Sequence, residues 1–172
     1  LRMRVWRENH AKRAKKTGEV NEIVYMINLD MVNDVRGFNA GGRDEMMGLL
    51  KEIGNKIKSI DPSFANEIHN SAGLHSDHQV FLMEGIPAAD PVGNLSKSVL
   101  DCYHANCDAF SLVNKKEMEN NVKYTSMLLY ALGNTNTIPA KKLDFYSTRD
   151  FFIKHNLRHE LELGNEWRWG NN

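Results

Sequence analysis

EIVYMINLDMVND, at residues 22–34, is a short and strongly apolar run, since seven of the nine residues from 23 to 31 are apolar. Several of them are β-branched or aromatic, and polar residues follow. This pattern predicts a strand buried on both faces, as in the parallel sheet of an α/β protein. Asp30 lies near the carboxyl end of this strand, where open α/β sheets bind ligands. Taken alone, its carboxylate is more typical of a cap or turn than of a ligand-binding group.

Two helices are predicted on either side of this strand. Residues 1–16 read as a helix that ends at Gly18, a plausible C-cap glycine. Apolar residues at spacings of three and four predict an amphipathic helix over residues 43–60. Asp61 and Pro62 end that helix, because the residue before a proline disfavours helical backbone.

The middle of the chain alternates between strand and helix. Residues 64–68 are predicted to form a strand, and residues 78–84 a short helix that ends at Gly85. Residues 86–89 are predicted to form a buried strand that Pro91 breaks. Alternating strands and helices are typical of the α/β class.

The last third of the chain is predicted to be mainly helical. Asn114, with a glutamate three residues later, resembles a capping box for a helix that ends at Gly133. Ser147 and Asp150 form a second cap pattern, before Phe151. The tail over 157–169 alternates apolar and charged residues, which predicts an edge strand.

Composition limits the kind of protein. A chain of 172 residues with 41% hydrophobic residues is expected to be one domain with a real core. The 22 basic and 22 acidic residues balance, which argues against a dedicated nucleic-acid binder. The basic cluster at 11–16 is interpreted as a solvated helix face. No apolar run approaches the roughly 20 residues of a membrane span. No signal peptide is visible, but a chain that begins at Leu1 leaves localisation open.

The histidines and cysteines are the candidate metal ligands. Three of the seven histidines, His69, His75 and His78, fall within ten residues, but surface or hydrogen-bonded histidines are favoured over zinc ligands for this cluster. Cys102 and Cys107 flank His104. Two free thiols are favoured there, while a disulfide or a zinc role stays open. The chain has no HExxH, C-x-x-C, Walker A, G-x-G-x-x-G or G-x-S-x-G motif.

Three segments together resemble the M28 family of zinc peptidases, exopeptidases in which one aspartate bridges two metals. The segments are INLDMV at 27–32, SDHQVFLMEGIPA at 76–88 and YHANCD at 103–108. The family has N-L-D-M-V-G, S-D-H-x-x-F-x-x-x-G-I-P-A and Y-H-T-x-x-D, in this order and at similar spacing. Here Asn33 replaces the usual glycine and Ala105 the common threonine.

The resemblance implies a role for each matching residue. Asp30 matches the aspartate that ligates one zinc, and His104 the histidine that ligates the other. Asp108 matches the aspartate that supports the metal ligands without binding the metal itself. The residues implied beside the substrate pocket are Asp77, His78 and Tyr103. Zinc accepts both carboxylate and imidazole ligands, and two zinc ions can activate a shared water.

The resemblance also implies the fold. It predicts a three-layer sandwich with a mostly parallel central sheet flanked by helices, of the phosphorylase/zinc-exopeptidase type and incomplete at the N-terminal side. Residues 1–133 are expected to be the C-terminal half of the catalytic domain. Residues 134–172 are expected to be an extension packed on the same domain, similar to those of some bacterial members.

The family motifs that are absent define the expected function. The H-x-D histidine, the bridging aspartate and the Glu-Glu pair with its general base have no match here, and the general base is expected upstream of Leu1. We therefore expect an aminopeptidase-like enzyme with peptide substrates and two zinc ions. The missing N-terminal half is its expected partner, and this chain alone is expected to be inactive. The alternatives are a non-catalytic binding or scaffold protein on a truncated fold, or an unrelated α/β domain. A periplasmic or extracellular location is expected by family analogy.

Overall fold

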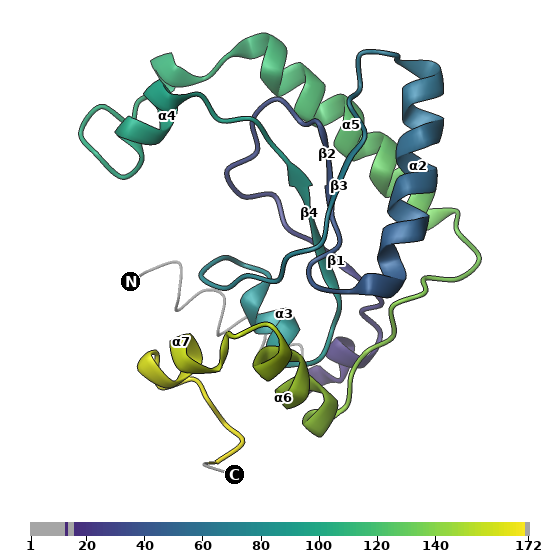
Figure 1. Cartoon of the computed structure of the whole chain (residues 1–172), viewed down its shortest axis with the longest axis vertical. Helices are drawn as coiled ribbons and strands as arrows, with labels where there is room; N and C mark the ends of the chain where they lie inside the picture. Colours follow the sequence, from purple (N-terminus) through teal and green to yellow (C-terminus); the bar gives the residue numbers. More distant parts are fainter. Residues whose placement is uncertain (1–12, 14–15, 171–172) are drawn as a thin grey trace.

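The computed structural model describes residues 13 and 16–170, and Figure 1 shows a central sheet with helices packed around it. The sheet has the order β1-β4-β2-β3. Its strands are β1 (Met26–Ile27), β2 (Gly37–Asn39), β3 (Glu67–His69) and β4 (Ala88–Val92). β1 and β4 are parallel, as are β2 and β3, whereas β2 and β4 are antiparallel. The chain is therefore an α/β protein with a mixed sheet.

The apolar run at 23–31 contributes an edge strand, so its predicted burial on both faces is wrong. Only Met26 and Ile27 pair with β4, and Asn28 adds one hydrogen bond from its N–H to the Ala89 carbonyl at 2.8 Å. Val24 and Leu29 are 61% and 60% exposed. An apolar sequence shows that a strand can be buried, but the neighbouring strands decide whether it is.

The two longest helices match the predicted pattern. η2 (Asp44–Met46) leads into α2 (Met47–Ile60), which ends at the predicted Asp61. α5 (Lys115–Gly133) begins at the predicted cap, because the Asn114 side chain accepts hydrogen bonds from the Lys116 and Glu117 amides. Both helices pack on one core cluster, whose fully buried members include Phe38, Met46, Leu50, Phe64 and Leu128.

A second core cluster lies on the opposite face of the sheet. Phe38 of the first cluster pairs with Pro91, and Ala88 of the second points the other way because side chains alternate along a strand. Three short helices cover this face: α3 (Gln79–Met83), α6 (Phe145–Lys154) and α7 (Arg158–Leu163). The buried residues of this cluster include Leu82, Phe151, Phe152, Leu161 and Trp169.

Two predicted strands and one predicted break differ from the structure. The strand expected at 64–68 is β3 at Glu67–His69, because Phe64 turns into the first core instead. The strand expected at 86–89 is β4 at Ala88–Val92, with Pro91 inside it. Pro91 is tolerated because the pairing of β1 with β4 ends at Ala89, so Pro91 lies beyond the end of that ladder.

The tail also differs from the prediction. Residues 158–163 form helix α7 and no edge strand, because Leu157 and Leu161, four residues apart, are both buried. α6 is capped by Asp144, whose carboxylate accepts a hydrogen bond from the Ser147 amide at 2.8 Å, so the cap predicted at Ser147 is three residues too late.

The expected N-terminal helix lies mostly outside the described residues. Residues 16 and 17 are helical, and Gly18 follows with φ +82°, as predicted for its end. A short helix, η1 (Glu19–Asn21), then leads to β1.

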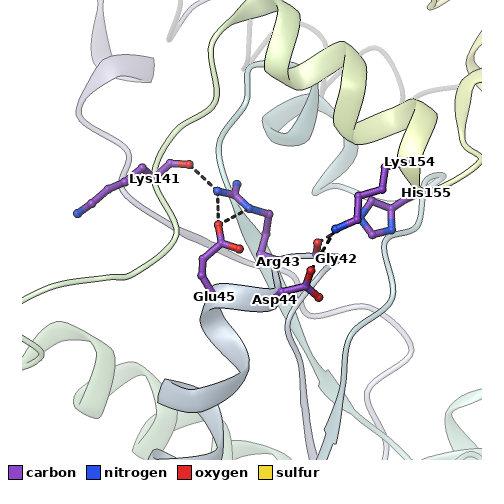
Figure 2. Close-up of polar contacts among 7 residues, drawn as sticks. All are labelled: Gly42, Arg43, Asp44, Glu45, Lys141, Lys154 and His155. Carbon is purple, nitrogen blue, oxygen red and sulfur yellow. Dashed lines mark hydrogen bonds and ion pairs between the residues drawn. The ribbon is translucent and has the colours of Figure 1, made fainter.

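The C-terminal region is joined to the loop that precedes α2 (Figure 2). Arg43 is buried, and its guanidinium donates to the Glu45 carboxylate and, at 2.8 Å, to the Lys141 carbonyl. Lys154 pairs with Asp44 at 3.1 Å, and His155 Nε2 donates to the Gly42 carbonyl, also at 3.1 Å. Burial, helped by the charge of Lys154, lowers the pKa of His155, and the hydrogen bond to Gly42 opposes this shift.

Candidate functional site

Asp30 follows the edge strand β1 and is tied to the S-D-H segment. Its Oδ2 accepts a hydrogen bond from Ser76 Oγ at 2.6 Å, and the buried Asn28 amide donates to the same hydroxyl at 3.1 Å. Asp30 caps no helix, since the next helical segment begins at Asp44. The hydroxyl and amide thus orient an otherwise exposed carboxylate at the carboxyl end of β1.

The backbone of the loop that follows β1 is held from two sides. The buried Asn121 of α5 accepts a hydrogen bond from the Val35 amide at 3.1 Å and donates to the Val32 carbonyl at 2.9 Å. On the other side, the Asn94 amide donates to the Asn33 carbonyl at 2.7 Å. The loop that carries Asp30 is therefore fixed by the fold around it.

Asn33, where the resembling family usually has glycine, needs no glycine backbone here. The left-handed conformations in this loop belong to Met31 and Asp34, with φ of +52° and +47°. The small residue required by close packing is Gly93, since a Cβ there would lie 2.8 Å from the Asn33 carbonyl oxygen.

The S-D-H segment leads directly into α3. His78 precedes the helix, and its Nε2 donates to the Gly73 carbonyl at 3.0 Å. His78 Nδ1 is buried without a hydrogen-bond partner among the described residues. Asp77 is half-buried in the same turn.

The C-terminal region holds this segment from outside. His75 pairs with Glu160 of α7 at 2.9 Å, and Gln79 donates to Glu166. Arg168 pairs with Glu84 just after α3, at 2.9 Å. His75 thus has a hydrogen-bonded role, which is the alternative to zinc that the sequence favoured.

Two buried asparagines and a half-buried aspartate form a polar row beside these residues, and sequence analysis did not predict it. Asn39 of β2 is opposite Asp90 of β4, and its amide is 3.3 Å and 3.4 Å from the two carboxylate oxygens. On the other side of β4, Asn28 continues the row in the register of β1. Burial raises the pKa of Asp90, against the hydrogen bond from Asn39. The signal in the sequence was a carboxylate directly after the buried strand predicted at 86–89.

His104 lies in a separate segment that projects from the fold. α4 (Lys97–Cys102) buries none of its residues and leads into an exposed turn, closed by a disulfide between Cys102 and Cys107. The prediction of two free thiols is therefore wrong, because the chain folds back and brings the two Cα atoms within 5.2 Å. Figure 1 shows α4 at one extremity of the molecule.

Within this turn His104 has φ +57°, and its ring lies against that of Tyr103 with the centroids 4.0 Å apart. Tyr103 and Asp108 are exposed as well. Asp108 and His104 share no hydrogen bond or ion pair in the described part of the chain, and the Asp108 amide donates to the Ala105 carbonyl at 3.0 Å.

The structure thus brings together two of the three motif segments. Asp30 and Ser76 are in contact, while His104 and Asp108 belong to the projecting turn. Within residues 13 and 16–170, no group of three or more His, Cys, Asp or Glu side chains could hold a metal ion. Carboxylate and imidazole suit zinc, which needs three or four ligands. The donors present fit zinc in kind but not in number, so these residues form no complete zinc site.

The exposed Asp30 carboxylate lies at the carboxyl end of β1, the position at which open α/β sheets bind ligands. The family model for peptidase family M28 matches residues 8–129, and the chain belongs to this family. M28 peptidases are generally zinc-dependent, so membership indicates a metal-dependent hydrolase that acts on peptides. Comparisons with curated proteins and with solved structures gave no match.

In the described residues, no helix is long and apolar enough to cross a membrane.

Proposed function

We propose that this chain carries part of the active site of a zinc-dependent exopeptidase, with Asp30 as a ligand to one of two zinc ions and His104 as a ligand to the other. The observation that carries the proposal is the 2.6 Å hydrogen bond from Ser76 to Asp30, because it joins two family motifs 46 residues apart in the chain. A carboxylate whose position is fixed by a neighbour is preorganised for a metal. When bound, the metal would supply a Lewis acid and an activated water.

The residues of this chain have supporting roles in the proposal. Ser76 and Asn28 orient the Asp30 carboxylate. Asp77, His78 and Tyr103 line the substrate pocket, and Asp108 supports the ligand His104.

The remaining ligands and the general base come from outside these residues. Asp30 and His104 provide one ligand each, whereas a zinc ion in a catalytic site has about three protein ligands. We propose that the N-terminal half of the same domain supplies them and completes a three-layer sandwich. The exposed Val24 and Leu29 beside the β1 edge support this, because an open edge with apolar neighbours is a pairing surface.

Residues 134–172 lie beyond the matched region, and we propose that they are an extension which stabilises the S-D-H segment. The disulfide supports a periplasmic or extracellular location, because disulfides persist in oxidising compartments.

The test is the protein purified from its native source. We expect a mass well above 19.7 kDa and about two zinc ions per molecule, as a two-metal site requires. In that protein Asp30→Asn and His104→Ala should each lose zinc and peptidase activity. The matched controls, Asp101→Asn and His159→Ala, change exposed residues of the same kinds and should keep both. The chain alone should not hydrolyse peptides.

Two results would contradict the proposal. Chelator-sensitive hydrolysis by the purified 172-residue chain would show that its own residues suffice. A native mass equal to that of this chain, without zinc, would favour the alternative function, a binding or scaffold protein. An apolar groove of about 430 Å³ between the Asp30 loop and α5 supports that alternative, and its lining includes Leu29, Val32, Met118, Val122 and Leu129.

A further inference from the structure

The segment that carries His104 has almost no packing of its own. α4 buries no residue, and neither does η3 (Phe110–Leu112), the helical turn that follows the disulfide loop. Every residue from 103 to 111 is exposed. A segment of this kind opens locally at little cost in free energy, because few buried contacts hold it.

His104 nevertheless has a conformation that an open chain rarely adopts. A positive φ in a residue with a Cβ costs about 1–2 kcal/mol, and His104 has φ +57°. Two backbone hydrogen bonds stabilise the turn, from the Ala105 amide to the Cys102 carbonyl at 2.9 Å and from the Asp108 amide to the Ala105 carbonyl at 3.0 Å. Both are exposed to water and contribute little by themselves.

The remaining constraint is covalent. The disulfide joins cysteines separated by five positions and so closes a loop of six residues around His104. Closing a loop this short raises the population of the closed conformation about 40-fold over the open chain in the chain-entropy model. The bond is therefore the largest single constraint on the turn.

We propose that Cys102 and Cys107 are positioning residues for His104. Their disulfide holds the imidazole against Tyr103 in the conformation in which it is presented as a ligand, and a thiol reductant releases it. A dithiol transfers two electrons and two protons, the Sγ–Sγ bond breaks to give two thiols, and the dithiol becomes a cyclic disulfide. The functional consequence of this inference rests on the proposed role of His104 as a zinc ligand. The effect of the disulfide on the conformation of the turn does not depend on that role.

The test is nuclear magnetic resonance of the 172-residue chain without metal, before and after dithiothreitol. The ring of Tyr103 should shift the His104 imidazole protons upfield in the oxidised chain, and reduction should abolish this shift. Exchange of the Ala105 amide should accelerate by up to about 40-fold. The chain has two cysteines, so the reductant acts only at this bond.

Two variants control the experiment. Cys102→Ser with Cys107→Ser should give the spectrum of the reduced chain under oxidising conditions. Tyr103→Leu should remove the ring shift while the disulfide and the slow Ala105 exchange remain, which identifies the source of the shift. Signals of Phe152 and Leu161 in the second core should stay unchanged throughout.

The inference is overturned if the His104 shift and the Ala105 exchange rate are the same in the oxidised and reduced chains. Because the sample contains no metal, this outcome would not test whether His104 is a zinc ligand. The zinc measurements on the native protein test that role separately. Conversely, loss of the ligand role would not alter the measured effect of the disulfide on the turn.

Discussion

The segment around Ser76 and the segment around His104 both belong to the proposed active site, yet they are held in different ways. Ser76 lies between Asn28, directly after β1, and Asp30, and the C-terminal region contacts its segment through three side-chain pairs. His104 lies in an exposed turn closed by a disulfide. Packing fixes the first segment and a covalent bond fixes the second. Core mutations should therefore affect the first, and reductants the second.

The largest expected effect comes from the core beneath the S-D-H segment. Phe152→Ala removes a fully buried ring of the second cluster and should lower the free energy of unfolding by about 3–5 kcal/mol. The matched control Phe110→Ala, in the exposed segment after His104, removes a ring that is 87% exposed. It should cost at most about 0.5 kcal/mol. Urea unfolding followed by circular dichroism measures both, and equal losses would refute the contrast.

A smaller effect is expected where α5 holds the Asp30 loop. Asn121→Ala leaves the Val35 amide and the Val32 carbonyl without their partner, which should cost about 2 kcal/mol. The control Asn120→Ala loses one 3.3 Å hydrogen bond to Asp34 and should cost less than about 1 kcal/mol. Thermal unfolding compares the two variants, and amide exchange at Val35 should accelerate only in the first. No difference between them would mean that Asn121 does not fix this loop.

Ser76→Ala should have a modest effect on stability and a clear one on metal binding. The exposed Asp30 carboxylate can exchange the lost hydrogen bond for water, so the cost should be about 1 kcal/mol. In the zinc-containing protein, zinc affinity should fall about 10–100-fold, because the ligand loses its orienting neighbour. The control is Ser98→Ala, whose hydroxyl contacts Ser96 beside α4. Competition with a chromophoric chelator measures affinity, and an unchanged value would exclude an orienting role for Ser76.

The smallest effect concerns pH. Hydrogen bonds from Lys123, Ser63 and Tyr124 hold the pKa of Asp61 well below its usual range. A lowered folded-state pKa gives stability that is present above the unfolded value of about 3.9. This stability is lost as the pH falls towards the folded value.

Asp61→Asn should therefore flatten the dependence of unfolding free energy on pH below about pH 4. The control is Asp101→Asn, which removes an exposed pair with Lys97 on α4 and should leave the profile of the parent chain unchanged. Urea unfolding at a series of pH values measures both, and a parallel profile for Asp61→Asn would refute the assignment.

Local patterns predicted the longer helices well. The apolar spacing over 43–60 and the cap at Asn114 gave α2 and the start of α5, because helix periodicity and caps depend on residues close in sequence. The tail was assigned wrongly as a strand. Its leucines alternate with charged residues, as in a strand, but Leu157 and Leu161 are also four residues apart, as on one face of a helix. Packing of both leucines on the second core cluster selects the helix.

The candidate site was predicted only in part. The motif residues Asp30, Ser76 and His104 were visible in the sequence, but their contacts were not. Asp90 and Asn39 were missed, because their pairing depends on the antiparallel register of β2 and β4. The disulfide was left open for a similar reason, since the approach of Cys102 and Cys107 depends on the turn between them.

The sequence by itself determined the α/β class, the long helices and the peptidase family, because apolar periodicity, caps and short motifs are local properties of the chain. Only the tertiary structure decided that β1 is an edge strand, that Ser76 meets Asp30 and that a disulfide encloses His104. Each of these features depends on how the strands are ordered or on how the chain turns back on itself. The contacts that stabilise them are therefore not visible in a local sequence pattern.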